Sequence, residues 1–198
     1  SSLIGFGSIS FDEYIALRDD YIARNLYLFV FEISAPRGFG EKWAQGHLKS
    51  LVPELIKPSK SSDINYSGQY DFFLDSNIKI EVKASRAVDA NKPKEPLYVK
   101  ALSKSSSSRF TMNFQQIKPA CCDVFVWVGV WRDEICYWVL SSNEVYNNPF
   151  YSKGQHRGNS GEGQLHLKES NIGEFSIYQC TGRDLLSKIR SAAFRNNQ

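Results

Sequence analysis

Residues 70–85 carry the sequence YDFFLDSNIKIEVKAS, and this stretch decides the fold. Two runs of β-favouring residues, 70–74 and 78–85, flank the polar segment 75–77, which is the pattern of a β-hairpin. The second run alternates between apolar and charged side chains up to residue 83, as a strand with one buried face does. The stretch predicts two antiparallel strands with one apolar and one charged face.

The register of this hairpin follows from its turn. If the polar segment forms the turn, Leu74 lies opposite Ile78, and three residues further along each strand Asp71 lies opposite Glu81. Directly opposed side chains share a face, with Cβ atoms about 4.5–5.5 Å apart. Lys83 follows Glu81 by two residues and shares that face. A slip of one residue would place the two carboxylates on opposite faces.

Two carboxylates this close repel each other unless a cation lies between them. Asp and Glu oxygens are ligands that Mg²⁺ accepts, usually with several waters retained. A divalent cation held there would lower the pKa of a bound water and offset phosphate charge, and the ammonium of Lys83 would stabilise the charged transition state. The constellation predicts a metal-dependent phosphodiesterase site.

At these residues the sequence resembles the PD-(D/E)xK nuclease superfamily, best known from type II restriction endonucleases. The match consists of Asp71 followed by Glu81-Val82-Lys83 on an antiparallel hairpin. The resemblance implies that Asp71 and Glu81 bind Mg²⁺, that the backbone carbonyl of Val82 assists, and that Lys83 orients or activates the attacking water. It also implies a restriction-endonuclease-like core.

The family commonly adds an acidic residue on the preceding helix. Here Gly40-Glu41-Lys42-Trp43 is similar, so Glu41 is the first candidate for this catalytic position and Glu54 the second. The proline that precedes the Asp in the family motif is replaced by Tyr70, at a position known to vary. The resemblance covers about residues 40–85.

The tripeptide Glu81-Val82-Lys83 is uninformative by itself. With 21 acidic residues and 14 Lys in 198 positions, random order gives about 1.5 acid-x-Lys matches. Its weight comes from its place on an alternating strand, opposite an Asp and after an acidic helix. The alternative is that this charged face is the solvated side of an edge strand.

Other elements follow from capping and periodicity. Ser10 with Glu13 and Thr181 with Asp184 are capping-box pairs, which open helices. We expect helices from 11 to the late 20s, at 40–51, at 114–119 and from 181 to 194, and further strands at 123–131, 134–140, 164–168 and 175–179. The order predicts an α/β or α+β fold, in which a mixed β-sheet is flanked by α-helices, over a single nuclease domain at 1–198.

Two segments are candidates for contact with double-stranded DNA. The loop 146–163 is rich in Asn, Gly and Ser, and side chains of its type read base edges and phosphates, although an ordinary surface loop is an equal alternative. The segment 114–119 resembles the region after the active-site strands in several restriction enzymes. The candidate DNA-binding residues are Gln155, His156, Arg157, Asn159, Gln164, Gln115, Gln116 and Lys118.

Composition limits the function classes only weakly. The net charge of +3 permits a nucleic-acid partner without requiring one. The four Cys form no C-x-x-C pair, which favours a reducing, cytoplasmic location over a disulfide framework. No apolar run approaches the roughly 20 residues of a membrane span.

The sequence thus predicts a Mg²⁺-dependent endodeoxyribonuclease, foremost a type II restriction endonuclease. A chain of this size that cuts both strands would act as a homodimer on a palindromic site. A junction-resolvase-like repair or recombination nuclease is the second possibility. A non-catalytic DNA-binding module on the same fold and an unrelated structural protein are the others.

Overall fold

The computed structural model describes residues 7–75, 77–154 and 161–196, which form a mixed α+β structure with two sheets. The first sheet has five strands in the order β1-β2-β5-β6-β9. Its β2 and β5 are parallel and its other pairs antiparallel. The strands are β1 (Phe72–Leu74), β2 (Ile78–Arg86), β5 (Val124–Val130), β6 (Ile135–Ser141) and β9 (Gln179–Cys180).

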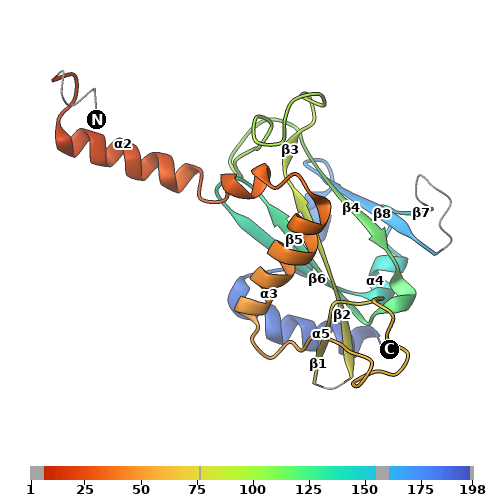
Figure 1. Ribbon diagram of the computed structural model, residues 1–198. Coiled ribbons are helices and arrows are strands. Elements are labelled where there is room, and N and C mark those ends of the chain that lie inside the picture. Colours follow the sequence, from red (N-terminus) through yellow and green to blue (C-terminus); the bar gives the residue numbers. More distant parts are fainter. Residues whose placement is uncertain (1–6, 76, 155–160, 197–198) are drawn as a thin grey trace.

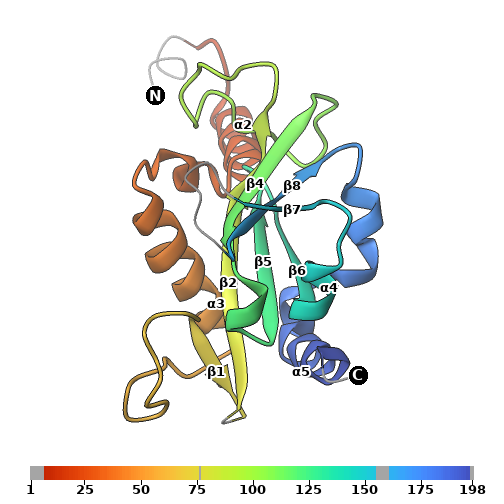
Figure 2. The same ribbon diagram turned by 90° about the vertical axis from the view of Figure 1, so that its right-hand side faces the viewer.

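The second sheet has four antiparallel strands in the order β3-β4-β8-β7. It crosses one side of the first sheet, and β4 runs next to the upper part of β2 (Figure 2). Its strands are β3 (Val88–Asp89), β4 (Phe110–Ile117), β7 (Tyr151–Lys153) and β8 (Gly163–Lys168).

Helices cover the opposite side of the five-stranded sheet and its lower end, and one helix projects from the body (Figure 1). The α-helices are α2 (Phe11–Arg24), α3 (Gln45–Leu51), α4 (Ser142–Tyr146) and α5 (Leu185–Asn196). The other helical segments are the 3-10 helices η1 (Leu28–Glu32), η3 (Pro119–Cys121), η4 (Ile172–Tyr178) and η5 (Gly182–Asp184), and the π-helix η2 (Gly38–Ala44). None of the described helices is long and apolar enough to cross a membrane.

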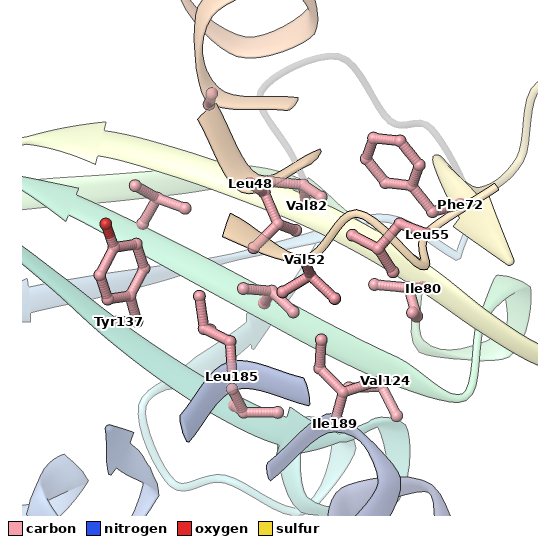
Figure 3. Close-up of a cluster of buried hydrophobic side chains, with 14 of the residues drawn as sticks. Leu48, Val52, Leu55, Phe72, Ile80, Val82, Val124, Tyr137, Leu185 and Ile189 are labelled. Carbon is pink, nitrogen blue, oxygen red and sulfur yellow. The ribbon is translucent and has the colours of Figure 1, made fainter. Parts of the chain in front are cut away.

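Strand β5 divides the interior into two hydrophobic cores. Its seven residues are all buried, as expected for a strand that is covered on both faces. Val124 and its alternating neighbours pack under α3 and α5 with Leu48 and Ile189 (Figure 3). Phe125 and Trp127 point the other way, into an aromatic core beneath the four-stranded sheet.

Several sequence predictions are confirmed. The hairpin of residues 70–85 forms, and Leu74 pairs with Ile78 as expected. The second hairpin forms as β5 and β6, and the strand at 164–168 is β8. Both capping boxes are present, at α2 and at the turn before α5. The coarse prediction of a mixed α+β fold with flanking helices holds.

Other predictions are wrong. The predicted helix at 114–119 is absent: residues 114–117 are the end of strand β4, and Pro119 begins the 3-10 helix η3. Residues 175–179 lie mostly in the 3-10 helix η4 rather than in a strand. The first helix ends at Arg24 instead of in the late 20s. The predicted loop 146–163 contains strand β7. In β4 a bulge breaks the alternation after Phe114, so that the next buried residue, Ile117, follows at a helical spacing of three.

Gly129 offers a test of the aromatic core. A Cβ added at this position would lie 2.6 Å from the Trp138 ring and 3.1 Å from Met112 Cε. Gly129→Ala is therefore expected to displace the ring and lower the free energy of unfolding by about 1–3 kcal/mol, measured by urea denaturation. Gly46→Ala in α3, where a Cβ meets nothing within 4 Å, should instead raise it by about 0.5–1 kcal/mol. Equal effects of the two substitutions would contradict this packing.

Candidate functional site

A cleft of about 880 Å³ opens along the edge of β2. Strand β1 is only three residues long and pairs with the first part of β2, so β2 continues beyond Ile80 without β1 beside it. The cleft lies along this stretch, with η2 on one side and β4 on the other. Asp71, Glu81 and Lys83 all line it. The structure thus brings the three central residues of the sequence prediction together.

The position of Asp71 results from the end of the β1–β2 ladder. The last paired residues are Phe72 and Ile80, and Asp71 follows immediately beyond them. Its backbone N–H donates to the carbonyl of Ile80 at 2.8 Å. Its Oδ2 accepts a hydrogen bond from the backbone N–H of Val82, also at 2.8 Å. The carboxylate therefore takes the place that the next strand carbonyl would occupy.

Glu81 and Lys83 lie on the cleft side of β2 because Ile80 and Val82 are buried on the other side. Their side chains form an ion pair, with Lys83 Nζ 2.7 Å from Glu81 Oε1. The Glu81 side chain is 18% exposed and that of Lys83 15%. Such limited exposure strengthens their interaction, since little water screens it.

Burial also changes the protonation of both carboxylates. It raises the pKa of Asp71, against the opposing effects of the Val82 N–H and the Lys83 ammonium. It raises the pKa of Glu81 to about 7, where Lys83 opposes the shift and the neighbouring Asp71 adds to it. Each carboxylate is therefore costly to ionise in this place, and a cation between them would lower that cost.

Gln45 is a site residue that the sequence prediction missed. It is a buried polar residue at the start of α3, and its Nε2 donates to Asp71 Oδ1 at 2.6 Å. Its Oε1 in turn accepts a hydrogen bond from Lys57 Nζ. Gln45 follows Glu41 by four residues, and this helical spacing was the available signal that both face the cleft. Lys57 lies in the loop after the helix and carries no such signal.

The two candidates for an additional acidic residue are placed differently. Glu41 lines the cleft from the π-helical η2, with its side chain 64% exposed and its Oε1 3.8 Å from Arg37 Nε. Glu54 is exposed in the turn after α3 and does not line the cleft. Insertions of a π-turn into a helix often occur at functional sites. Of the two, only Glu41 shares the cleft with Asp71.

Strand β4 forms a polar wall of the cleft. Its bulge leaves both Gln115 and Gln116 exposed, and both line the cleft together with Lys118. Gln116 has a φ of 54°, a left-handed conformation that is uncommon for a residue other than glycine. Lys118 forms an ion pair with Glu162 at 2.8 Å. On the same strand, the side-chain oxygen of Asn113 is buried without a hydrogen-bond partner.

The other five predicted DNA-binding residues are not found in the cleft lining of the described structure. Gln155, His156, Arg157 and Asn159 lie outside the described residues. Gln164 belongs to β8, where it pairs with Ser152 of β7, and it is not part of the cleft lining. Of the four predicted DNA-binding residues that the structure describes, three therefore line the cleft: Gln115 and Gln116 in β4, and Lys118 directly after this strand.

The donor set fits a hard divalent cation. The described part of the chain holds no group of three or more His, Cys, Asp or Glu side chains that could hold a metal. Mg²⁺, however, is usually bound by one or two carboxylates and several waters. Asp71 and Glu81 supply two carboxylates. The carbonyl of Val82 points to the same side as its N–H, because both groups of a strand residue face the same neighbour.

Comparisons of the chain with known protein families and with curated proteins found no match.

The raised pKa of Glu81 has a consequence for stability. In the unfolded chain this carboxyl has its ordinary pKa of 4.5, whereas in the folded chain its pKa is about 7. Its ionisation therefore opposes folding, and the free-energy cost grows as the pH rises from 4.5 to about 7. We therefore predict that the melting temperature of Glu81→Gln, measured in EDTA, rises relative to that of the parent protein as the pH increases from about 5 to about 8. A difference in melting temperature that stays constant across this range would contradict the burial of an ionisable Glu81.

Proposed function

We propose that this protein is a Mg²⁺-dependent endodeoxyribonuclease of the PD-(D/E)xK type, specifically a type II restriction endonuclease that cuts double-stranded DNA. The observation that carries the proposal is the convergence of Asp71, Glu81 and Lys83 in one cleft. Two buried, mutually repelling carboxylates next to a lysine are costly to maintain, and they suit a metal and a phosphate better than a purely structural role.

Each residue has a defined part in this proposal. Asp71 and Glu81, with the carbonyl of Val82, hold the cation, which when bound lowers the pKa of water and neutralises phosphate charge. Gln45 and the Val82 N–H fix the orientation of the Asp71 carboxylate through hydrogen bonds. Lys83 lies close enough to Glu81 to orient a water molecule and to stabilise charge on the phosphate. Glu41 supplements the negative charge from η2.

The β4 wall is the proposed contact to DNA bases. The amide groups of Gln115 and Gln116 each offer a donor and an acceptor, the combination that reads an adenine edge. Lys118 at the end of this wall supplies a phosphate contact. Two active sites are needed to cut both strands at one place, so we also propose a homodimer that acts on a palindromic site in the cytoplasm.

Metal-dependent cleavage is the direct test. Asp71→Asn, Glu81→Gln and Lys83→Met are each expected to lower the rate of DNA cleavage in Mg²⁺ by at least about 1,000-fold, because each removes a group that acts in the transition state. The measurement is the appearance of discrete fragments from plasmid and phage DNA. Lys79→Ala is the matched control. Lys79 lies on the same strand and the same face as Glu81 and Lys83, two residues before Glu81, but it does not line the cleft.

The outcomes separate the alternatives. Discrete fragments that require Mg²⁺ and vanish in EDTA support a restriction enzyme, and sequencing of their ends gives the recognition site. Cleavage restricted to branched DNA supports a junction resolvase instead. A mobility shift without any cleavage supports a DNA-binding module. Full activity of all three cleft variants would refute the assignment of the site.

The β4 wall generates a separate prediction. Gln115→Ala should weaken binding to the recognition sequence by about 5- to 150-fold, the usual contribution of an amide that reads a base, with little change on unrelated DNA. Lys118→Ala should weaken binding to the recognition sequence and to unrelated DNA equally, because a phosphate contact does not depend on the base sequence. Fluorescence anisotropy with Ca²⁺ in place of Mg²⁺ measures both. If Gln115→Ala weakens binding to both DNAs equally, Gln115 does not read bases.

A further inference from the structure

Basic side chains line the cleft at four places in the described part of the chain, and one of them differs from the others. Three of these side chains form ion pairs with carboxylates, namely Arg37, Lys83 and Lys118. The fourth, Arg86, forms no ion pair with any described residue. Within the described lining, Arg86 therefore carries a positive charge that no neighbouring carboxylate neutralises.

Arg86 is the last residue of β2. Alternation places its side chain on the opposite face of the strand from Glu81 and Lys83. It nevertheless lines the cleft, because the cleft follows the edge of β2 that the short β1 leaves open. At about 3.3 Å per residue, Arg86 lies roughly 10 Å beyond Lys83 along the strand. It is thus near the candidate catalytic residues without touching them.

The guanidinium of Arg86 is held from two sides. Its Nη1 donates to the carbonyl of Val30 at 3.1 Å and to that of Ile33 at 2.8 Å. Its Cζ lies 4.2 Å from the centroid of the Phe39 ring. That ring is almost fully buried and stacks in turn on Trp43, with the two centroids 5.7 Å apart. A side chain fixed in this way loses little conformational entropy when it binds a ligand.

These contacts leave one edge of the guanidinium unused. Arginine has five N–H donors, and the two carbonyls account for both hydrogens of Nη1. Nε and Nη2 donate to no described group, and neither atom is buried. Two parallel N–H groups of this kind match two oxygens of a phosphate. A tie to two carbonyls alone needs only a neutral amide, so the charge and the free edge point to an anion.

The charge of Arg86 is kept at a cost. The side chain is half-buried, and burial lowers the pKa of its guanidinium without any carboxylate that opposes the shift. A cation that loses water without gaining an anion is held unfavourably, although arginine stays charged at neutral pH. An anion bound in the cleft would offset this cost.

We propose that Arg86 binds a phosphate of the DNA backbone a few nucleotides from the phosphate that is cleaved, and so sets the position of the DNA along β2. This inference rests on the proposed function, because it takes DNA as the anion in the cleft. Each DNA strand carries a phosphate about every 3.4 Å of helix axis. The roughly 10 Å between Lys83 and Arg86 therefore corresponds to about three phosphates when the DNA axis follows β2.

The salt dependence of DNA binding tests this contact on the full chain, by fluorescence anisotropy in EDTA with a labelled DNA duplex. Each phosphate contact contributes about 0.9 to the slope of log K against log[NaCl]. Arg86→Gln keeps a neutral NH2 group for the two carbonyls. It is expected to reduce the slope by about 0.9 and to weaken binding roughly tenfold at about 0.05 M NaCl.

Two further variants separate charge from structure. Arg86→Lys keeps the charge but lacks the fork of parallel donors, so it should keep the slope and weaken binding by about threefold to tenfold. Arg109→Gln is the matched control, because Arg109 forms an ion pair with Glu169 and does not line the cleft. It should leave the slope as it is in the parent protein.

A purely structural role of Arg86 predicts another result: lower melting temperatures for both Arg86 variants, with the slope of the parent protein. An unchanged slope for folded Arg86→Gln, or an equal loss of slope for Arg109→Gln, would overturn the proposal. Circular dichroism checks the folding of each variant. If Arg86→Gln does not fold, Arg86→Lys decides, and binding as tight as that of the parent protein overturns the proposal.

Failure of this contact can be distinguished from failure of the nuclease assignment. If the parent protein binds DNA in EDTA but cleaves none in Mg²⁺, the nuclease assignment fails, and a reduced slope for Arg86→Gln still supports the phosphate contact. If the parent protein cleaves DNA and Arg86→Gln keeps its slope, the phosphate contact fails alone. A parent protein that does not bind DNA overturns both.

Discussion

Strand β5 has water on neither side, and this constraint organises the rest of the protein. Its valines require an apolar layer from α3 and α5, and its Phe125 and Trp127 require a second layer from the four-stranded sheet. Because β2 pairs with β5 in parallel over seven residues, the direction and the height of β2 are fixed by the buried strand. The short β1 then leaves the open edge on which the carboxylates lie. The candidate site is therefore held in place by β5, a strand whose seven residues are all buried.

The site itself works against stability. Burial raises the pKa of both Asp71 and Glu81, which means that the folded state holds two charges at neutral pH less readily than water does. The hydrogen bonds from Gln45 and from Val82 offset this cost for Asp71 only. Proteins commonly accept such local costs where a ligand later relieves them. The large two-sided core supplies the stability that makes this cost tolerable.

The hairpin register and the central residues of the site could be predicted from the sequence, because alternation and a polar turn specify register by short-range rules. Strand β4 could not, because its bulge places the buried Phe114 and Ile117 three residues apart and so imitates a helix. The contact between Lys57 and Gln45 depends on how a loop folds back over α3, which no local pattern encodes. A capping box and helical spacing predicted the first helix correctly at its start, but they could not reveal that, in the part of the chain that the structure describes, none of its residues is buried.

The bulge in β4 also separates evolutionary changes of ligand preference from changes that affect folding or the candidate catalytic residues. It directs two consecutive side chains, Gln115 and Gln116, outward into the cleft, while the residues on either side, Phe114 and Ile117, stay fully buried. Both outward positions lie outside the core, and they lie on a different strand from Glu81 and Lys83. In a lineage of such proteins, preference for one ligand over another can change at Gln115 without any loss of folding or of the chemical groups on β2, whereas the left-handed backbone of Gln116 limits its replacements to residues that accept this conformation.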